Sequence, residues 1–248
     1  MTLNCQVSWR FPARNPEPTP SNLSELSSVV KQLKLDVAFV HDGDADRLVL
    51  ISPSGEILPH SVASILLLRS LELSSGTIVL SENTSNDVED AAVEAGLKVV
   101  RTKIGKTFTE LRNGAILSME PSKAAYGRWG YWEDGIFAAV VIANILASSN
   151  SVLEKTVGNI RWNYTQLNIQ GATDIEQLEP KVLESLNKYG VEEVRRVDGI
   201  KFVLRDGSWL MIRRSGTEPK LRIYCESRDK TILRKIVKLV ASCVEGGK

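Results

Sequence analysis

The stretch VAFVHDGDADRLVLIS, residues 37 to 52, places three aspartates between two short apolar runs. The runs VAFV and LVLI are rich in residues that favour β-strands, so the pattern predicts two strands joined by a tight turn. The glycine and the alanine between the aspartates are small enough to let the backbone of this turn curl. We therefore expect the turn to bring Asp42, Asp44 and Asp46 close together at the end of a strand.

Three carboxylates at this spacing repel one another, and a hard cation that takes oxygen ligands relieves the repulsion. Mg²⁺ binds such ligands at about 2.1 Å. The alternative is a solvated acidic turn in which Arg47 offsets part of the charge. An EF-hand calcium loop also begins D-x-D-x-D, but it needs glycine at its sixth position and glutamate at its twelfth, where this chain has Arg47 and Pro53. Calcium binding of that type is excluded, and the magnesium site and the solvated turn both remain open.

Patterns of helix and strand alternate on both sides of this stretch. Before it, a proline-rich segment predicts extended backbone, and Asn22 with Glu25 predicts a capping box at the start of an amphipathic helix. After it, alternating helices and strands up to about residue 150 predict a layered α/β unit, with Asp134 capping a long, largely buried helix. In the last hundred residues strands outnumber helices and the loops are short, which predicts a small α+β domain with antiparallel pairing.

The expected elements follow from the periodicity of apolar residues and from turn residues. The expected helices lie at 61–71, 87–96, near 107–112, and at 134–148, 174–188 and 230–244. The expected strands lie at 77–80, 98–100, 115–118, 163–170, 199–205, 208–214 and 221–227.

Two further segments carry polar chemistry. In RRSGTEPKLRIYCES, which begins at Arg213, a turn holds arginine, serine, glycine and threonine between two strands, a combination that can surround a phosphate. An ordinary polar hairpin is the alternative. In MEPSKAAYGRWGYW, which begins at Met119, Glu120 and Ser122 can bond sugar hydroxyls beside aromatic rings, and the alternative is a loop whose aromatics pack on their own domain.

Composition excludes several classes of protein. Thirty-one basic residues against thirty acidic ones leave a net charge of +1 without a polybasic block, so we expect neither nucleic acid nor an anionic membrane as a partner. Cys5, Cys225 and Cys243 show no paired spacing, which argues against a disulfide framework or a zinc site. The N-terminal residues lack the apolar core of a signal peptide, and no long uncharged apolar run is present. These features indicate a cytoplasmic protein.

The order of the three motifs resembles one family, the α-D-phosphohexomutases, which includes phosphomannomutase, phosphoglucomutase and phosphoglucosamine mutase. FPARNPEPTPSNL followed by HDGDADR resembles the second domain of that family and its metal loop, usually DGDGDR. TKIG at 102–105 and EPS at 120–122 resemble the third domain, which carries a GE-x-S-G sugar loop, and IRRSGTEPKLRIYCES resembles the phosphate loop of the fourth. The resemblance implies that the first two domains are α/β layers with mixed sheets and that the third part of the chain is a small α+β domain. The expected domains span residues 1–55, 56–155 and 156–248.

The resemblance also implies a role for each matching residue. Asp42, Asp44 and Asp46 would bind Mg²⁺, with Arg47, Glu120 and Ser122 contacting the substrate, and Arg213, Ser215, Gly216 and Thr217 would hold the phosphate that is not transferred. In that family a phosphoserine gives its phosphoryl group to a hexose phosphate, the bisphosphate turns around, and the serine is rephosphorylated from the other end.

The sequence departs from the family in two respects. In the sugar loop, Met119 and Lys123 replace the flanking glycines and Ala124 stands where many members have histidine, which leaves the sugar specificity open. The family's nucleophilic serine lies in a T-A-S-H-N type motif, and no serine among these 248 residues is followed by histidine. The sequence therefore predicts a partial second domain, a complete third and fourth domain, and no catalytic nucleophile.

Two functions follow from this comparison. In the first, the chain is the C-terminal part of a phosphohexomutase that interconverts hexose 1- and 6-phosphates with a separate polypeptide supplying the phosphoserine. In the second, it is a catalytically silent module that binds sugar phosphates or another protein. We also expect an exposed apolar patch near residues 1 to 50, covered by a partner or by self-association.

Overall fold

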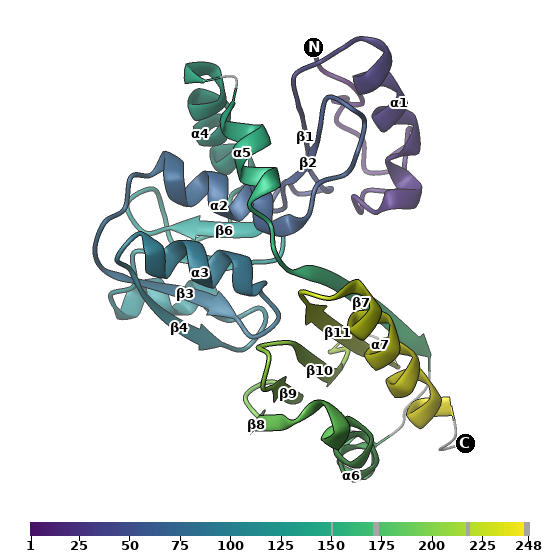
Figure 1. Ribbon diagram of the computed structural model, residues 1–248. Coiled ribbons are helices and arrows are strands. Elements are labelled where there is room, and N and C mark those ends of the chain that lie inside the picture. Colours follow the sequence, from purple (N-terminus) through teal and green to yellow (C-terminus); the bar gives the residue numbers. More distant parts are fainter. Residues whose placement is uncertain (150, 171–173, 217–218, 246–248) are drawn as a thin grey trace.

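The structure is a computed structural model that describes residues 1–149, 151–170, 174–216 and 219–245. In these residues the strands form three separate sheets of two, four and five strands, in that order along the chain (Figure 1). Helices pack against each sheet, so the α/β layers predicted from the sequence are confirmed.

The first sheet pairs β1 (Ala38–Val40) and β2 (Val49–Ile51) antiparallel, on either side of the aspartate turn. A short 3₁₀ helix, η1 (Pro20–Asn22), and helix α1 (Ser24–Gln32) precede it. The buried residues that α1 and its start share with this sheet are Leu23, Val30, Val40, Val49 and Ile51.

The predicted capping box at Asn22 and Glu25 is wrong. Asn22 belongs to η1, and its side-chain amide donates a hydrogen bond to the carbonyl oxygen of Glu17 at 2.8 Å. Helix α1 begins two residues later, and no side chain of the described residues caps it. Pro20 fixes φ at the first position of η1, so the chain enters the helix through a 3₁₀ turn that Asn22 itself forms.

The four-stranded sheet has the order β4–β3–β5–β6. Its strands are β3 (Thr77–Ser81), β4 (Lys98–Thr102), β5 (Leu117–Glu120) and β6 (Lys123–Tyr126). The first three run parallel, and β6 turns back antiparallel to β5 through a hairpin that the sequence did not predict. Where the pattern near 107–112 predicted a helix, the chain forms the 3₁₀ helix η2 (Thr107–Asn113).

Four helices belong to this unit: α2 (His60–Ser70), α3 (Asn86–Glu94), α4 (Gly135–Ser148) and α5 (Val152–Gly158). Helix α2 is buried on all sides from Ser61 to Leu68 because α3, α4, α5 and β2 surround it. The expectation of a largely buried α4 is wrong: Ile136 and Val140 are 57% and 65% exposed. Helix α5 packs Leu153 into the same core. It contains residue 155, where the sequence placed the end of the middle domain.

Among the described residues, no single helix is long and apolar enough to cross a membrane. The bent pair of α4 and α5 meets that requirement only when both are taken together, by length and composition.

The five-stranded sheet is antiparallel throughout, with the order β7–β11–β10–β9–β8. Its elements are β7 (Asn163–Gln170), α6 (Ile175–Leu186), η3 (Asn187–Tyr189), β8 (Val191–Arg195), β9 (Ile200–Leu204), β10 (Trp209–Arg214), β11 (Lys220–Ser227) and α7 (Lys230–Glu245). Leu210 and Ile212 pack among residues of α6 and α7 on one face. Trp209 and Met211 alternate with them and therefore point to the opposite face, where Ile104 of the middle unit packs.

The segment between α5 and β7 is held by the start of α3. The carboxylate of Asp87 accepts hydrogen bonds from the backbone N–H groups of Arg161 at 2.9 Å and Trp162 at 3.2 Å. Five positions before Asp87, the carbonyl oxygen of Glu82 accepts a hydrogen bond from the ammonium of Lys201 of β9 at 2.6 Å. Buried polar contacts therefore join the last two units, in addition to apolar packing.

Candidate functional site

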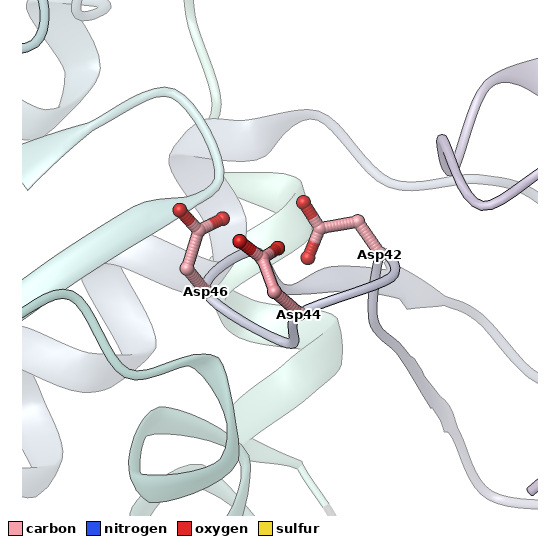
Figure 2. A group of neighbouring side chains, drawn as sticks. All are labelled: Asp42, Asp44 and Asp46. Carbon is pink, nitrogen blue, oxygen red and sulfur yellow. The ribbon is translucent and has the colours of Figure 1, made fainter. Parts of the chain in front are cut away.

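The aspartate turn lies between β1 and β2, as the sequence predicted (Figure 2). Ala45 has φ = +60°, in the left-handed region that costs a non-glycine residue conformational energy, and this turns the backbone back on itself. One ligand atom from each of Asp42, Asp44 and Asp46 lies within 4.8 Å of the others. The turn therefore gathers three carboxylates, as expected from their spacing.

The electrostatics of this turn suit a cation. Burial raises the pKa of Asp42, and the nearby carboxylates of Asp46 and Asp44 add to the rise, against a hydrogen bond from the backbone N–H of Arg47. Oδ1 of Asp46 is buried and accepts no hydrogen bond from the described residues, with Nε of Arg47 at 3.9 Å. An anionic oxygen left without a donor beside two other carboxylates fits the oxygen-rich ligand set that Mg²⁺ prefers.

Arg47 is engaged with carboxylates in this structure. Its guanidinium forms an ion pair with Glu17, and its Nε lies 3.4 Å from Oδ2 of Asp42. The ring of His41 contacts the carbonyl oxygen of Arg47 at 2.9 Å. Arg47 thus offsets part of the negative charge, and its contact with a substrate stays a prediction.

The sugar-loop residues occupy the hairpin between β5 and β6. Glu120 is buried, and its Oε1 accepts hydrogen bonds from the N–H of Gly105 at 2.7 Å and the hydroxyl of Thr107 at 2.9 Å. Burial, and then the nearby Glu133, raise the pKa of this carboxyl. Ser122 adopts φ = +68°, and its hydroxyl oxygen lies 2.6 Å from Nδ1 of His60. The sequence did not single out His60, because only the fold brings it to this hairpin.

The hairpin and the aspartate turn form one connected structure. The backbone N–H of Leu48 donates to the carbonyl oxygen of Ser122 at 2.7 Å, and Arg47 and Lys123 form an antiparallel β-bridge. The ammonium of Lys123 contacts the carboxylate of Asp46. These contacts fix the predicted sugar loop directly beside the predicted metal loop.

The start of α4 also contacts the aspartate turn. The N–H of Gly135 donates to the carbonyl oxygen of Ala45 at 3.0 Å. A Cβ at position 135 would lie 2.6 Å from the carbonyl oxygen of Arg47, which is too close for any other residue. Glycine at this position therefore allows the aspartate turn to sit on the helix.

The phosphate loop lies between β10 and β11. Arg213 and Arg222 are cross-strand partners, and the Nε atoms of both are buried and find no hydrogen-bond partner among the described residues. The hydroxyl of Ser215 is likewise buried without a partner in the described part of the chain, and no described atom lies within 4 Å of where a Cβ of Gly216 would be. Thr217 lies outside the described residues. Unpaired donors at this turn fit an anion, and Arg222 could have been found from the sequence by its register with Arg213.

A chain of contacts links the phosphate loop to the sugar loop. Oδ2 of Asp198 lies 3.5 Å from Nη1 of Arg213 and accepts a hydrogen bond from the N–H of Ile104 at 3.0 Å. The next residue, Gly105, donates to Glu120. The TKIG segment therefore joins both loops, although they lie in different units.

The aromatic residues of the MEPSKAAYGRWGYW segment pack mainly on their own unit. The rings of Tyr126 and Trp129 stack on Phe137 of α4, with centroids 6.0 Å and 5.1 Å away. Tyr131 and Trp132 are about half exposed, at 48% and 55%. The packing alternative thus describes the first two rings.

A cavity of about 660 Å³ opens between the three units. Residues from each unit line it, including Pro18, His60, Pro121, Tyr164, Lys230 and Arg234. It reaches the sugar-loop hairpin at Pro121, and it is also lined by His60 of α2, whose imidazole contacts Ser122 of that hairpin.

Three family models match successive parts of the chain. Residues 1–55 match "Phosphoglucomutase/phosphomannomutase, alpha/beta/alpha domain II", residues 59–163 match domain III of the same family, and residues 172–242 match its C-terminal domain. Together the three matches span nearly all of the chain.

Curated relatives give the same picture. A phosphoglucomutase/phosphomannomutase of Thermococcus kodakarensis is 30% identical over 99% of this chain and 55% of its own length. A probable phosphoglucosamine mutase of Methanosarcina acetivorans is 33% identical over 96% of this chain and 56% of its own length. The chain spans about half the length of the curated relatives it matches.

Solved structures share the fold at lower identity. A phosphoglucomutase/phosphomannomutase family protein from Burkholderia thailandensis superposes with a TM-score of 0.81 at 22% identity, covering 97% of this chain and 53% of that one. An N-acetylphosphoglucosamine mutase of Aspergillus fumigatus, solved with GlcNAc-6P and magnesium, superposes with a TM-score of 0.59 at 16% identity, covering 88% of this chain and 52% of that one.

Proposed function

The chain belongs to the phosphoglucomutase/phosphomannomutase family, and we propose that it supplies the metal, sugar and phosphate loops of a hexose phosphate mutase. The observation that carries this proposal is the continuous set of contacts from Asp46 through the hairpin to Glu120, and from there through Gly105 and Asp198 to Arg213. Loops from three units are tied together in an order that suits one extended, phosphorylated ligand.

Each loop has a separate task in this proposal. Glu120 and Ser122 bond the sugar hydroxyls and so fix the ring. Nε of Arg213, Nε of Arg222 and the hydroxyl of Ser215, which have no hydrogen-bond partner among the described residues, bond the phosphate that stays in place. Charge-assisted hydrogen bonds from arginine to phosphate are strong and directional. With the sugar ring and the first phosphate held in this way, the second phosphate of the ligand is directed toward the aspartate turn.

Magnesium held by Asp42, Asp44 and Asp46 would neutralise charge on the phosphoryl group being transferred. Arg47 lies against the same carboxylates and would keep them oriented. Phosphoryl transfer depends mainly on positioning and charge neutralisation, which are the tasks that these residues can perform. The phosphoserine would come from residues outside these 248, in a partner polypeptide or elsewhere in a longer chain.

The preference among hexose phosphates is not fixed by the loops. The relatives are named for glucosamine, glucose, mannose and, in one case, pentose phosphates. We propose a hexose phosphate as the substrate class. We also place the protein in a reducing compartment, the cytoplasm, because Cys5, Cys225 and Cys243 are all free thiols.

A mutase assay tests the proposal. The assay compares two samples: the chain alone, and the chain mixed with a separately made, phosphorylated N-terminal half of a curated relative. Each sample receives a hexose 1-phosphate, with glucose 1,6-bisphosphate as primer. We expect formation of the 6-phosphate only when both parts are present, since an in-line nucleophile is needed for the transfer. If the chain binds hexose phosphate but the docked pair shows no turnover, the silent binding module becomes the better description.

A further inference from the structure

Lys123 brings a positive charge into the aspartate turn from a neighbouring element. It is the first residue of β6, and its ammonium contacts the carboxylate of Asp46 and lies 2.9 Å from Oε2 of Glu133. The side chain of Lys123 is 20% exposed, and that of Glu133 is 13% exposed. The ammonium is thus held between two carboxylates, one of which is a proposed metal ligand.

The backbone leaves this side chain little choice of position. Lys123 forms a β-bridge with Arg47, the residue that follows Asp46, and the carbonyl oxygen of Ser122 accepts the N–H of Leu48 at 2.7 Å. These bonds place the Cα of Lys123 alongside the turn. In the GE-x-S-G pattern that the hairpin resembles, this position is a glycine, which offers no charge at all.

An ammonium and a divalent cation need the same oxygen atoms. Lys123 bonds Oδ2 of Asp46, while Oδ1 of the same carboxylate is buried and accepts no hydrogen bond from the described residues. A metal ion at this turn would draw on Asp46 together with Asp42 and Asp44, and the two positive charges would repel each other across one carboxylate. Glu133 gives the ammonium a second partner that is not one of the three aspartates of the turn.

We propose that the ammonium of Lys123 competes with a divalent cation for Asp46. When the cation binds, the ammonium gives up its contact with Asp46 and stays paired with Glu133. The proposal rests on the proposed function, since it concerns the regulation of the same metal loop. Lys123 lowers the affinity of the turn for Mg²⁺, and Glu133 limits that reduction. In the absence of metal, Lys123 and Arg47 together relieve the repulsion among the three carboxylates.

Calorimetric titration of the whole chain with Mg²⁺ tests this competition. Lys123→Met removes the charge and keeps the length of the side chain, and Lys123→Gln serves as a second variant in case the first does not fold. Lys98→Met is the matched control, because Lys98 is an exposed residue of the edge strand β4 and makes no ion pair among the described residues. We expect both Lys123 variants to bind Mg²⁺ about tenfold more tightly, and the control to bind like the wild type.

Glu133→Gln provides the opposite perturbation. It removes the second partner of the ammonium, so we expect weaker Mg²⁺ binding in the wild-type background and a smaller effect when Lys123→Met is already present. An Mg²⁺ affinity that is unchanged or weaker in both Lys123 variants would overturn the proposal.

The titration also separates this inference from the proposed function. If the wild type binds Mg²⁺, Asp44→Asn abolishes the binding and the Lys123 variants match the wild type, the competition is wrong and the metal site stands. If neither the wild type nor any Lys123 variant binds Mg²⁺, the metal loop of the proposed function fails together with the inference.

Discussion

The hydroxyl oxygen of Ser122 lies 2.6 Å from Nδ1 of His60, although the two residues are 62 positions apart. His60 is the first residue of α2 and lines the cavity between the units, so this bond ties the proposed sugar loop to a helix of the same core. Desolvation, and then the positive charge of Arg47, lower the pKa of His60. The lowered pKa favours the neutral imidazole, whose Nδ1 donates to the hydroxyl oxygen of Ser122 or accepts from the hydroxyl, according to its tautomer.

The first prediction concerns this bond. His60→Ala leaves Ser122 without its partner while the hairpin backbone stays in place. We expect the affinity for hexose 1-phosphate to fall about fivefold, the effect of one neutral hydrogen bond of about 1 kcal/mol. Calorimetry with glucose 1-phosphate measures it, and Mg²⁺ titration of the same variant is the control, which we expect to be unchanged. Equal sugar phosphate affinity in the two proteins would rule out a positioning role for His60.

The second prediction compares two neighbouring arginines. Nη1 of Arg213 lies 3.5 Å from Oδ2 of Asp198, and its Nε has no hydrogen-bond partner among the described residues, whereas Arg214 is exposed and pairs with Asp174 at 3.0 Å. We expect Arg213→Ala to cost about 1.5 to 3 kcal/mol of glucose 1-phosphate binding and Arg214→Ala to change it little. Arg222→Ala should resemble Arg213→Ala, because the two side chains are cross-strand partners. Equal affinities in all three variants would contradict the phosphate loop.

The third prediction is a pH dependence that arises at the contact between the last two units. Burial, and then the charge of Arg101, lower the pKa of Lys201 to about 7. The side chain packs 4.3 Å from the ring of Trp209 and 3.3 Å from Oε2 of Glu82. An unfolded lysine has a pKa of about 10.4, so between pH 7 and 10 the unfolded chain binds more protons than the folded one.

The sign follows from linkage: this lysine makes the free energy of unfolding rise with pH across that window, by up to about 1.4 kcal/mol per pH unit. Lys201→Met removes the titrating group. Urea unfolding at pH 7.5 and 9 should show a larger gain in stability for the wild type than for the variant. Parallel pH profiles would mean that the pKa of Lys201 is not lowered.

The fourth prediction concerns the segment before β7. Asp87 accepts hydrogen bonds from two backbone N–H groups there, and removing the carboxylate leaves both without a partner. We expect Asp87→Ala to speed tryptic cleavage after Arg161. Glu94→Ala is the control, since Glu94 reaches Arg161 only through a largely exposed ion pair at 3.8 Å. Cleavage at the same rate in both variants would show that Asp87 does not hold this segment.

Periodicity was enough to predict most of the elements that lie within one unit. The apolar patterns at 61–71 and 230–244 correspond to α2 and α7, and the alternation at 163–170 corresponds to β7. Asp134 caps α4 as expected, accepting a hydrogen bond from the N–H of Phe137. Such signals are local, so a single sequence contains them in full.

The errors arise where a longer-range or competing effect decides the structure. The hairpin strand β6 was not predicted, because two of its four residues are alanine and the segment Lys123–Tyr126 has no clear strand pattern of its own. Its strand structure depends on pairing with β5. The exposure of Ile136 and Val140 depends on which face of α4 meets α2. Strand β8 carries a bulge and consecutive exposed glutamates, which hide the strand pattern.

The same limit applies to the site. The aspartate turn and the phosphate hairpin are short segments whose residue types were informative by themselves. The partners that complete them, His60 for Ser122 and Lys123 for Asp46, come from elements 62 and 77 positions away, and no local pattern marks them. Exposure of Val7, Trp9 and Phe11 agrees with the expected apolar surface near the N-terminal residues, and its covering partner stays a prediction.

The central claim is that the three loops bind one hexose phosphate together, and amide chemical shifts of the ¹⁵N-labelled chain test it most directly. The chain is titrated with glucose 1,6-bisphosphate in the presence of Mg²⁺, and the amides of Asp44, Ser122 and Gly216 report the three loops. The account predicts that all three signals shift along the same saturation curve, and that Arg213→Ala weakens the response at every loop. Shifts confined to one loop, or midpoints that differ from loop to loop, would contradict a single shared site.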